Sequence, residues 1–262
     1  MILTDTHTHL YYETDPEKLD ALVRRSLDQQ VRRMFLPNVN VQSVPLVMNL
    51  AARYPEHCFA MLGLHPCDVK GAATDEVSEY REELAAIERM IPGHTIYAIG
   101  EIGIDLYWDK TTLAIQQDAF RTQIRWAKAL GLPIVIHCRE AFNEVYEILL
   151  EEQGPALRGI FHCFTGTLEE AHKIIALGFY LGIGGVVTYK NAGLDKVVAE
   201  LELKDLVLET DSPYLPPVPF RGKPNESSYL VHVAQKVGDI LQKPVEEVAQ
   251  VTTANSRVVF GR

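Results

Sequence analysis

The sequence predicts an α/β protein that folds as a closed (β/α)8 TIM barrel in a single domain, from residue 1 to residue 262. Short apolar stretches suited to buried strands alternate with amphipathic helical stretches, and this alternation runs through eight strands. No low-complexity segment, block of like charge or linker interrupts it. An open, doubly wound sheet is the alternative architecture, but the sequence has no G-x-G-x-x-G turn to support it.

The first strand is predicted at the amino terminus, because residues 1–3 are apolar and Thr4, Thr6 and Thr8 are β-branched. Nothing before Tyr12 breaks this extended stretch. The later strands are apolar runs expected at 33–37, 58–64, 95–101, 133–137, 159–162, 179–183 and 205–210. Helices are expected at 16–30, 41–54, 74–90, 113–130, 141–152, 168–177 and 193–201, and after a proline-rich loop at 226–241 and 244–259.

Composition places the chain among ordinary soluble globular proteins, with 47% hydrophobic and 23% charged residues. No apolar stretch reaches the length of a membrane span, and the amino-terminal region carries too many charges for the apolar core of a signal peptide. The four cysteines form no C-x-x-C pair and are Cys58, Cys67, Cys138 and Cys163. We therefore expect a cytoplasmic protein with reduced thiols and no contact with a membrane.

The formal net charge of −10 excludes one way of binding a polyanion. A protein that holds long nucleic acid by its overall electrostatic field should be basic. If the substrate is a nucleic acid, it must therefore be held by a few local cations and by metal ions.

Polar residues follow the predicted strands where a barrel places its active site, because the loops at the carboxyl ends of the strands build that site. His7 and His9 lie at the end of the first strand, with Asp5 one step deeper on the same face. The later strands contribute, in order, His65, Glu101, His137, His162 and Asp211. The remaining histidines, expected at the surface, are His57, His94, His172 and His232.

Four imidazoles and two carboxylates suit two divalent ions that keep open positions for water and substrate. The expected metal ligands are His7, His9, Glu101, His137, His162 and Asp211. Glu101 is the expected bridge, because the fourth strand lies between the first and the fifth and sixth. A divalent ion lowers the pKa of a bound water, so we expect hydrolysis with Asp211 as ligand and general base. His65 is the next candidate for the base, and Mg, Mn, Zn, Fe and Co are not distinguished.

Seven short motifs together resemble the TatD family of metal-dependent deoxyribonucleases, within the wider amidohydrolase group of TIM-barrel hydrolases. They are TDTHTHL at 4–10, GLHP at 63–66, GEIGID at 100–105, PIVIHCR at 133–139, HCFTG at 162–166, ETDSPYL at 209–215 and RGKPNE at 221–226. The resemblance covers essentially the whole chain. It implies a binuclear site formed by the six ligands given above and hydrolysis of phosphodiester bonds, typically in DNA from the 3′ end. Glu101 stands where many amidohydrolases carry a carboxylated lysine, as expected for the TatD branch.

Three functions fit this pattern. The first is a two-metal phosphodiesterase that acts on single-stranded DNA ends, with no obligate protein partner. The second is a hydrolase with the same site and an ester or amide substrate, such as an aminoacyl-RNA deacylase, and the third is a catalytically silent metal-binding scaffold. Arg139, Arg221 and Lys223 are the expected substrate-binding residues, because fixed cations near the rim suit a phosphate. Their alternative role is that of surface salt-bridge partners.

Overall fold

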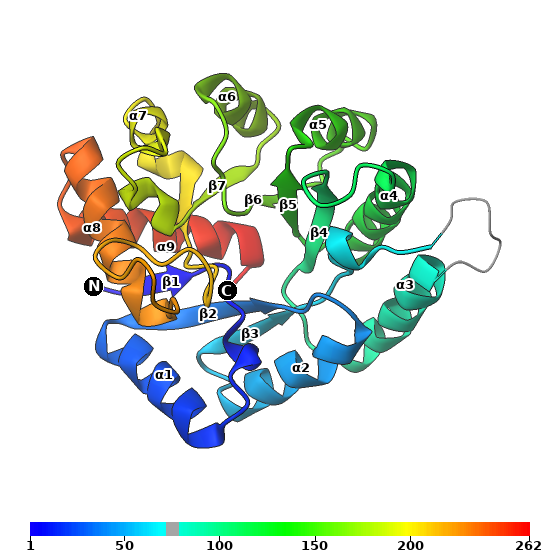
Figure 1. Cartoon of the computed structure of the whole chain (residues 1–262), viewed down its shortest axis with the longest axis horizontal. Helices are drawn as coiled ribbons and strands as arrows, with labels where there is room; N and C mark the ends of the chain where they lie inside the picture. Colours follow the sequence, from blue (N-terminus) through cyan, green and yellow to red (C-terminus); the bar gives the residue numbers. More distant parts are fainter. Residues whose placement is uncertain (72–78) are drawn as a thin grey trace.

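The computed structural model describes residues 1–71 and 79–262 of the chain. Within them, eight parallel strands follow one another in the order of the sequence (Figure 1). The strands are β1 (Leu3–Asp5), β2 (Val31–Pro37), β3 (Cys58–Met61), β4 (Ile99–Asp105), β5 (Ile134–Arg139), β6 (Gly159–Phe161), β7 (Tyr180–Ile183) and β8 (Leu206–Leu208). Regular pairing joins β1 to β3 in one group and β4 to β8 in a second.

Two short seams close these groups into a barrel. At the first seam, Leu62 beyond β3 forms a parallel bridge with Ile99 of β4. At the second, the N–H of Thr6 beyond β1 donates to the carbonyl of Leu208 in β8 at 3.0 Å. The predicted fold class, a (β/α)8 barrel, is therefore confirmed.

Helices surround the strands on the outside of the barrel (Figure 1). They are α1 (Pro16–Asp28), α2 (Val44–Arg53), α3 (Glu79–Met90), α4 (Leu113–Leu130), α5 (Phe142–Glu151), α6 (Leu168–Ala176), α7 (Leu194–Val198), α8 (Leu230–Leu241) and α9 (Val245–Phe260). Short 3₁₀ helices are η1 (Leu10–Tyr12), η2 (Val41–Ser43), η3 (Pro66–Asp68), η4 (Ile91–Gly93), η5 (Gly185–Thr188), η6 (Leu203–Asp205) and η7 (Ser227–Tyr229). Among residues 1–71 and 79–262, no helix has both the length and the apolar character needed to cross a membrane.

The barrel interior is apolar at its amino-terminal end. Phe35, Phe59 and Val135 of β2, β3 and β5 pack there with Val259 and Phe260 of α9. The ring of Phe260 stacks on that of Phe35, with 3.8 Å between the ring centroids. Figure 1 shows α9 crossing behind the ring of strands. Because this helix fills the amino-terminal end, polar side chains gather at the carboxyl-terminal end.

The same helix also ties the end of the chain to its beginning. The hydroxyl of Thr253 in α9 donates to the carbonyl of Ile2 at 3.0 Å. The hydroxyl of Thr4 in β1 donates in turn to Thr253 at 3.4 Å. The first strand is thus held by a helix that is nearly the whole length of the sequence away.

The first strand is shorter than predicted. It ends at Asp5, whose carboxylate accepts the N–H of His7 at 3.3 Å and turns the chain, as aspartate often does two residues before a turn amide. His7 and His9 therefore lie beyond the strand and are not alternate residues on its face. The predicted helix at 113–130 coincides with α4, and residues 79–90 of the helix predicted at 74–90 form α3. Residues 74–78 lie outside the described part of the chain.

The prediction for the fourth strand was wrong, because β4 covers Ile99–Asp105 instead of 95–101. Glu101 consequently lies inside the strand and not at its end. Gly103 permits the extension, since its φ is +143° and a Cβ atom there would lie 2.0 Å from the carbonyl oxygen of His137. With this glycine, β4 pairs with β5 as far as Asp105, which stands opposite Arg139.

Candidate metal centre

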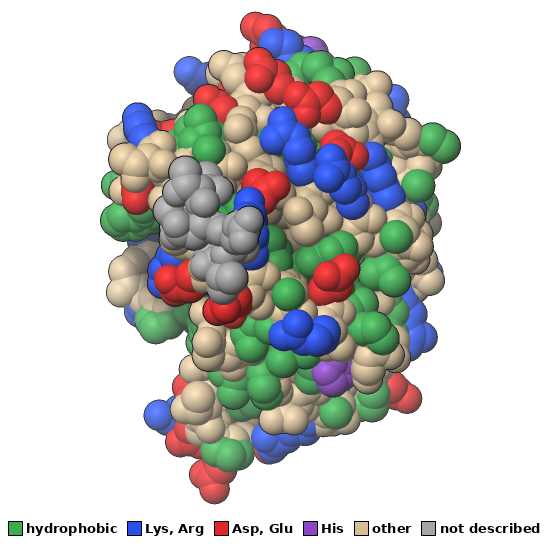
Figure 2. All heavy atoms as spheres, turned by 90° about the vertical axis from the view of Figure 1, so that its right-hand side faces the viewer, with side chains coloured by type: hydrophobic (Ala, Val, Ile, Leu, Met, Phe, Trp, Pro, Cys, Tyr) green, Lys and Arg blue, Asp and Glu red, His purple; other side chains and the backbone are tan. Residues whose placement is uncertain are grey.

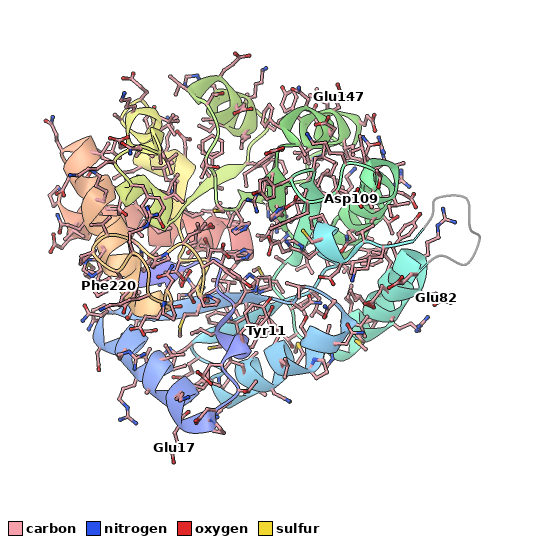
Figure 3. The ribbon with its side chains drawn as sticks, in the orientation of Figure 1. Tyr11, Glu17, Glu82, Asp109, Glu147 and Phe220 are labelled. Carbon is pink, nitrogen blue, oxygen red and sulfur yellow. The ribbon has the colours of Figure 1, made fainter. Side chains whose placement is uncertain are left out.

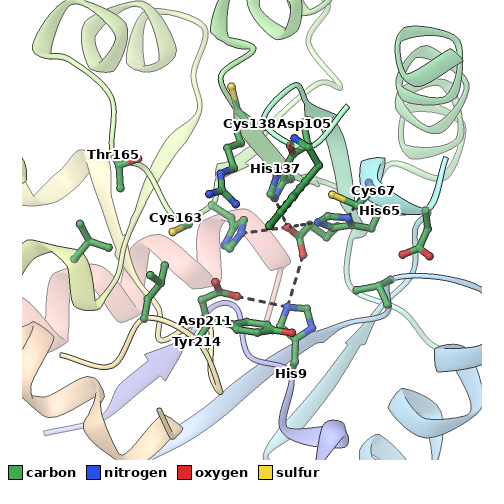
Figure 4. A pocket seen from close by; sticks show the side chains of 18 of the residues that line it. His9, His65, Cys67, Asp105, His137, Cys138, Cys163, Thr165, Asp211 and Tyr214 are labelled. Carbon is green, nitrogen blue, oxygen red and sulfur yellow. Dashed lines mark hydrogen bonds and ion pairs between the residues drawn. The ribbon is translucent and has the colours of Figure 1, made fainter. Parts of the chain in front are cut away.

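A cavity of about 650 Å³ opens at the carboxyl ends of the strands. The predicted catalytic and metal-binding residues that line it are His9, His65, Glu101, His137, His162 and Asp211. His7 does not line the cavity but is fully buried beside these residues. Figure 4 shows His9 and Asp211 on one side of the cavity and His65 and His137 on the other. The structure thus brings all the residues expected at the rim into one site.

Glu101 lies at the centre of this site, because its two carboxylate oxygens face different imidazoles. Oε2 lies 3.1 Å from Nε2 of His7. Oε1 lies 2.8 Å from Nδ1 of His137 and 3.2 Å from Nε2 of His162. A carboxylate in this position can contact two ions, one through each oxygen. The bridging role expected from the sequence stays a prediction, and the position of Glu101 is compatible with it.

His7, His9 and Asp211 form the first group of side chains that could hold a metal ion. The Nε2 atoms of His7 and His9 lie 3.3 Å apart. Asp211 Oδ1 lies 3.8 Å and 3.5 Å from these two nitrogens. Two imidazole nitrogens that face each other beside two carboxylates are suited to a cation placed between them. This donor set of nitrogens and oxygens fits Zn²⁺, Mn²⁺ or Fe²⁺ better than Mg²⁺, which prefers oxygen alone.

Two further groups share Glu101. One combines it with His7 and His162, and the other combines it with His65 and His137. The rings of His7 and His162 are stacked, with 3.6 Å between their centroids. The other five residues expected as ligands therefore gather around the carboxylate of Glu101, and His65, which was expected only in catalysis, belongs to the same circle of side chains.

Three imidazoles are oriented by a second residue at the nitrogen that faces away from Glu101. These contacts are His9 Nδ1 to Tyr11 Oη at 2.9 Å, His162 Nδ1 to Glu209 Oε1 at 3.0 Å and His137 Nε2 to Asp105 Oδ2 at 2.8 Å. A carboxylate can only accept, so the facing nitrogens of His162 and His137 carry a proton. Once a metal ion has displaced the proton from the other nitrogen of each ring, that nitrogen can present its lone pair to the centre, which is the form that binds a metal.

His65 is held in the opposite way. Its Nδ1 accepts the backbone N–H of Cys67 at 3.1 Å, while its Nε2 lies 3.3 Å from Glu101 Oε1. A neutral imidazole whose Nδ1 accepts must carry its proton on Nε2. His65 therefore faces the centre as a hydrogen-bond donor, and this arrangement suits an oxygen better than a metal ion.

The residues that orient the imidazoles were missed by the sequence analysis. Glu209 and Asp105 are buried carboxylates at the ends of apolar strands, and that contrast was the signal that could have found them. Tyr11 gives no such signal, since it carries no charge and follows Leu10 in a short stretch that the sequence does not set apart. Figure 3 shows Tyr11 near the middle of the ring, whereas Glu17 and Glu147 lie at its outer edge.

The charges of the site shift its pKa values in opposite directions. Burial raises the pKa of Glu101, but the surrounding imidazoles, led by His65 and His162, hold it well below its usual value. Burial lowers the pKa of His162, but the carboxylates of Glu209 and Glu101 outweigh burial and raise it well above its usual value. The pKa of His7 is lowered by burial and by the charge of His162. A metal ion that binds here must displace protons from the imidazoles.

Asp5 supports the site from below and is not one of the groups that could hold a metal. It is fully buried and accepts the N–H and the hydroxyl of Thr210 at 2.9 and 2.6 Å. Burial raises its pKa to about 7, against the effect of these hydrogen bonds. Through Thr210 and His7, Asp5 connects the two loops that carry the first metal-binding group, since Asp211 follows directly after Thr210.

The three cations expected to bind substrate lie at different distances from the centre. Arg139 lines the main cavity, and its guanidinium lies 3.7 Å above the ring of Tyr107. Lys223 lines a neighbouring cavity of about 550 Å³ that shares His9 and Tyr12 with the first.

Arg221 lines neither of these cavities and stacks on Tyr189 at 3.9 Å. In the described part of the chain, none of the three cations lies within 4.0 Å of a carboxylate oxygen. They are therefore not the surface salt-bridge partners that the alternative reading expected.

The histidines expected outside the site do not line the main cavity. His94 and His172 are exposed, and His57 and His232 are half-buried. Nδ1 of His57 lies 2.8 Å from the carbonyl of Arg32, far along the chain from any of the candidate ligands. The separation of the nine histidines into a site and a surface group thus agrees with the positions predicted from the strand ends.

Comparison with known proteins supplies an independent observation. A family model described as TatD related DNase matches residues 4–261. The chain is 38% identical over 260 residues to the uncharacterized metal-dependent hydrolase YabD of Bacillus subtilis, with 99% of each chain covered. It is 31% identical over 246 residues to a protein of Edwardsiella piscicida named 3′-5′ ssDNA/RNA exonuclease TatD, with 91% of this chain and 92% of that protein covered.

Among solved structures, the crystal structure of YjjV, a TatD homologue from Escherichia coli, superposes on this chain with a TM-score of 0.89. The two share 28% sequence identity, and the superposition covers 99% of this chain and 98% of the other. The barrel and its connections are thus shared along the whole length of both proteins.

Proposed function

The chain belongs to the TatD family of metal-dependent hydrolases, and from this premise we propose that it hydrolyses phosphodiester bonds at the 3′ end of single-stranded DNA with two divalent ions. The observation that carries the proposal is the convergence of five imidazoles and the carboxylate of Asp211 around Glu101. The name of the Edwardsiella relative supports a nucleic-acid substrate. The location in the cytoplasm remains a prediction from the sequence.

When bound, the two ions would lower the pKa of the attacking water and stabilise negative charge on the phosphate. Asp211 is the residue that we expect to take the proton of that water, because its carboxylate lines the cavity. Burial raises the pKa of Asp211, but the hydrogen bond from His9 and the charges of His162 and His7 keep it below its usual value. Asp211 is therefore ionised at neutral pH and free to accept a proton, which can then pass to the departing 3′ oxygen.

His65 has a different part in this scheme. Because the amide of Cys67 occupies its Nδ1, the proton on Nε2 points toward Glu101 and the cavity. We expect this N–H to donate to an oxygen of the phosphate and to hold it in place for attack. Because Nδ1 of His65 already accepts a hydrogen bond and Nε2 carries a proton, His65 has no free nitrogen to take the proton of the water. This tautomer therefore favours Asp211 as the base.

A phosphate fits the site better than an acyl group because of the cations beside it. Arg139 lies at the cavity, and Lys223 lies in the cavity next to it, both without a carboxylate partner among the described residues. A guanidinium or an ammonium group binds the oxygens of a phosphate strongly, whereas a neutral ester or amide offers no negative charge.

The test is an assay across metals with the purified protein. Metal content is measured first, and then the hydrolysis of a single-stranded oligonucleotide labelled at its 5′ end, of a small activated phosphodiester and of a set of acyl esters and amides. We expect stepwise shortening of the oligonucleotide from its 3′ end and turnover of the small phosphodiester. Turnover of acyl substrates alone would assign the same centre to carbonyl chemistry, and a metal-loaded protein that cleaves nothing would be a scaffold.

A further inference from the structure

Two aromatic side chains stand exposed directly after β4, beside the metal centre. Trp108 has 71% of its surface exposed, the largest value for a big apolar side chain in the described residues, and Tyr107 has 48%. Trp108 also lines the main cavity. A tryptophan usually buries most of its surface, so one that faces a cavity next to candidate metal ligands suggests a binding role.

The position of these rings is fixed by the site itself. The N–H groups of Tyr107 and Trp108 both donate to Oδ1 of Asp105, at 2.9 and 3.4 Å. The other oxygen of Asp105 holds Nε2 of His137 at 2.8 Å. One carboxylate therefore sets both the orientation of a candidate metal ligand and the start of the aromatic loop. The loop does not depend on the Trp108 side chain for these hydrogen bonds, because they use backbone N–H groups.

Arg139 completes this surface. Its guanidinium lies 3.7 Å above the ring of Tyr107 and 5.7 Å from the centre of the Trp108 ring. The two aromatic rings meet edge to face at 4.8 Å. The cation thus lies beside an exposed indole, and no carboxylate oxygen of the described residues lies within 4.0 Å of it. A flat aromatic face next to an unpaired positive charge matches a nucleobase that carries a phosphate.

The order of the strands places a second aromatic pair across the barrel mouth. Trp108 and Arg139 follow β4 and β5, whereas Tyr12 and Tyr214 follow β1 and β8, which lie opposite in a ring of eight strands. Both tyrosines line the cavity, and Tyr12 stacks on the ring of His9 at 5.2 Å. The candidate metal centre lies between the two sides. Because Tyr12 stacks on a candidate ligand and Trp108 contacts none of the candidate ligands in the described contacts, Trp108 is the residue to change in a test.

We propose that Trp108 and Arg139 form a binding subsite for an unpaired nucleobase next to the phosphate that is cleaved, an inference that rests on the proposed function. The base stacks on the indole of Trp108, and Arg139 contacts the phosphate that the base carries. A base within a duplex cannot present its face in this way, so the subsite selects single-stranded ends. The subsite also gives the enzyme a means of holding polymer substrate that does not depend on a basic surface.

The experiment compares Trp108→Ala with Trp108→Phe on two oligonucleotides in the metal-loaded protein. One oligonucleotide is intact, and the other has an abasic spacer in place of the nucleotides at its 3′ end. Stacking of one base on an aromatic side chain corresponds to about five- to 150-fold in binding. We expect Trp108→Ala to raise KM for the intact strand by an amount in this range and Trp108→Phe to restore most of the loss. For the abasic strand, the two variants should differ little from each other.

Binding can be measured without turnover by fluorescence, using an oligonucleotide with phosphorothioate linkages that resist hydrolysis. The chain has two tryptophans, and the other, Trp126, is 9% exposed in α4. Quenching on addition of the intact strand should therefore come from Trp108 and be absent in Trp108→Phe. Leu150→Ala, which changes an exposed apolar residue on the outer helix α5, is the matched control and should bind as the unchanged protein does.

The possible results separate the subsite from the proposed function. If the unchanged protein shortens the intact strand and Trp108→Ala does so with the same KM, the subsite is wrong while the nuclease proposal stands. Equal losses of Trp108→Ala on the intact and abasic strands would also overturn the subsite, because the base would then play no part. If the unchanged protein hydrolyses acyl substrates and no oligonucleotide, the nuclease proposal fails, and the subsite fails with it.

Discussion

The histidines of the centre differ in the nitrogen that they offer, and this difference is set by residues outside the centre. His162 and His137 are turned toward Glu101 by the carboxylates of Glu209 and Asp105. His65 is turned into a donor by a backbone amide. These contacts separate imidazoles that are expected to bind a metal, such as His162 and His137, from His65, which is expected to contact only the substrate.

We predict that His7→Ala, His137→Ala and His162→Ala each lower the metal content as well as the rate. Each change removes an imidazole nitrogen within 3.2 Å of a Glu101 oxygen, which is the donor set proposed for the ions. Elemental analysis of the purified variants measures the effect. His94→Ala changes an exposed histidine away from the cavity and is the control. Full metal stoichiometry in all three variants would contradict the assignment of these ligands.

Asp211→Asn is expected to separate chemistry from binding. The amide keeps an oxygen that can contact a metal ion, but it cannot take a proton at neutral pH. Turnover should fall by about a hundredfold or more, the usual contribution of a general base, with a smaller loss of metal than in the histidine variants. Turnover and metal content are measured on the same preparation. Near-normal turnover would move the base to another residue.

The six candidate ligands could be picked out from the sequence because each follows an apolar stretch of residues, and the ends of such strands meet at one rim of a barrel. The contacts of Tyr11, Asp105 and Glu209 could not, since each joins side chains whose distance depends on how the loops fold. The tautomer of His65 could not be predicted from the sequence either, because it is set by the backbone amide of Cys67. Cys67 lies in η3, a helix too short to show a periodic pattern of apolar residues.

At the scale of elements, long amphipathic helices were predictable and short strands less so. The helix α4 has enough turns for its apolar period to fix both ends, whereas β1 and β8 have three residues each. The end of β1 depends on one hydrogen bond between Asp5 and His7. The extension of β4 depends on Gly103, which reads in the sequence as a loop residue.

Gly103→Ala should destabilise the barrel where β4 meets β5. The new Cβ would lie 2.0 Å from the carbonyl oxygen of His137, and the φ of +143° is strained for any residue with a side chain. Adding backbone strain to overpacking gives an expected loss of at least about 3 kcal/mol in the free energy of unfolding, measured in urea. Gly93→Ala, where nothing lies within 4 Å of the added atom, should cost little. Equal stability of the two variants would show that β4 and β5 can move apart at Gly103 without a loss in the free energy of unfolding.

An ion pair between α1 and the loop before η7 makes stability depend on acid pH. The Nε atom of Arg25 donates to both oxygens of Glu226 at 2.9 and 3.1 Å. Burial raises the pKa of Glu226, but the hydrogen bonds from Arg25 and Ser228 outweigh burial and lower it. Glu226 therefore binds a proton more weakly in the folded state than in the unfolded state. Its contribution is present above pH 4.5 and is lost as the pH falls through the lower folded pKa.

We predict that Arg25→Met lowers the free energy of unfolding at pH 7 by about 1–2 kcal/mol, because a mostly buried carboxylate loses its partner while Arg25 itself is half exposed. The difference from the unchanged protein should shrink as the pH is lowered toward 3, in urea unfolding at a series of pH values. Lys243→Met removes an exposed pair with Glu247 and should change stability by less than about 0.5 kcal/mol. A difference that grows toward acid pH would reverse the assigned sign.

The surface of the whole molecule agrees with its net charge of −10. Figure 2 shows acidic and basic side chains interspersed on the face turned to the viewer. Many cations are paired, as Arg121 is with Glu151 at 2.7 Å between α4 and α5. Few unpaired cations therefore lie near the cavities, where a substrate could use them. This feature was predictable from composition, whereas the positions of Arg139, Arg221 and Lys223 required the fold.

Binding of a single-stranded oligonucleotide should therefore depend only weakly on salt. If Arg139, Arg221 and Lys223 each neutralise one phosphate, the slope of log K against log salt concentration should be no steeper than about −2. The affinity of a phosphorothioate strand, measured at several salt concentrations, gives this slope, and Arg221→Ala with Lys223→Ala should flatten it. A steep slope together with strong binding to intact duplex would mean that a broad surface holds the DNA.

The contact of α9 with β1 has a consequence for the synthesis of the protein. His7 and His9 leave the ribosome about two hundred residues before Asp211, roughly ten to forty seconds at ordinary rates of synthesis. During that time β1 lacks both β8 and the helix whose Thr253 holds Ile2 and Thr4. The nascent chain thus carries a pair of uncovered imidazoles that cannot yet meet their other partners. We expect the ions to enter only after β8 and α9 have left the ribosome and the barrel has closed.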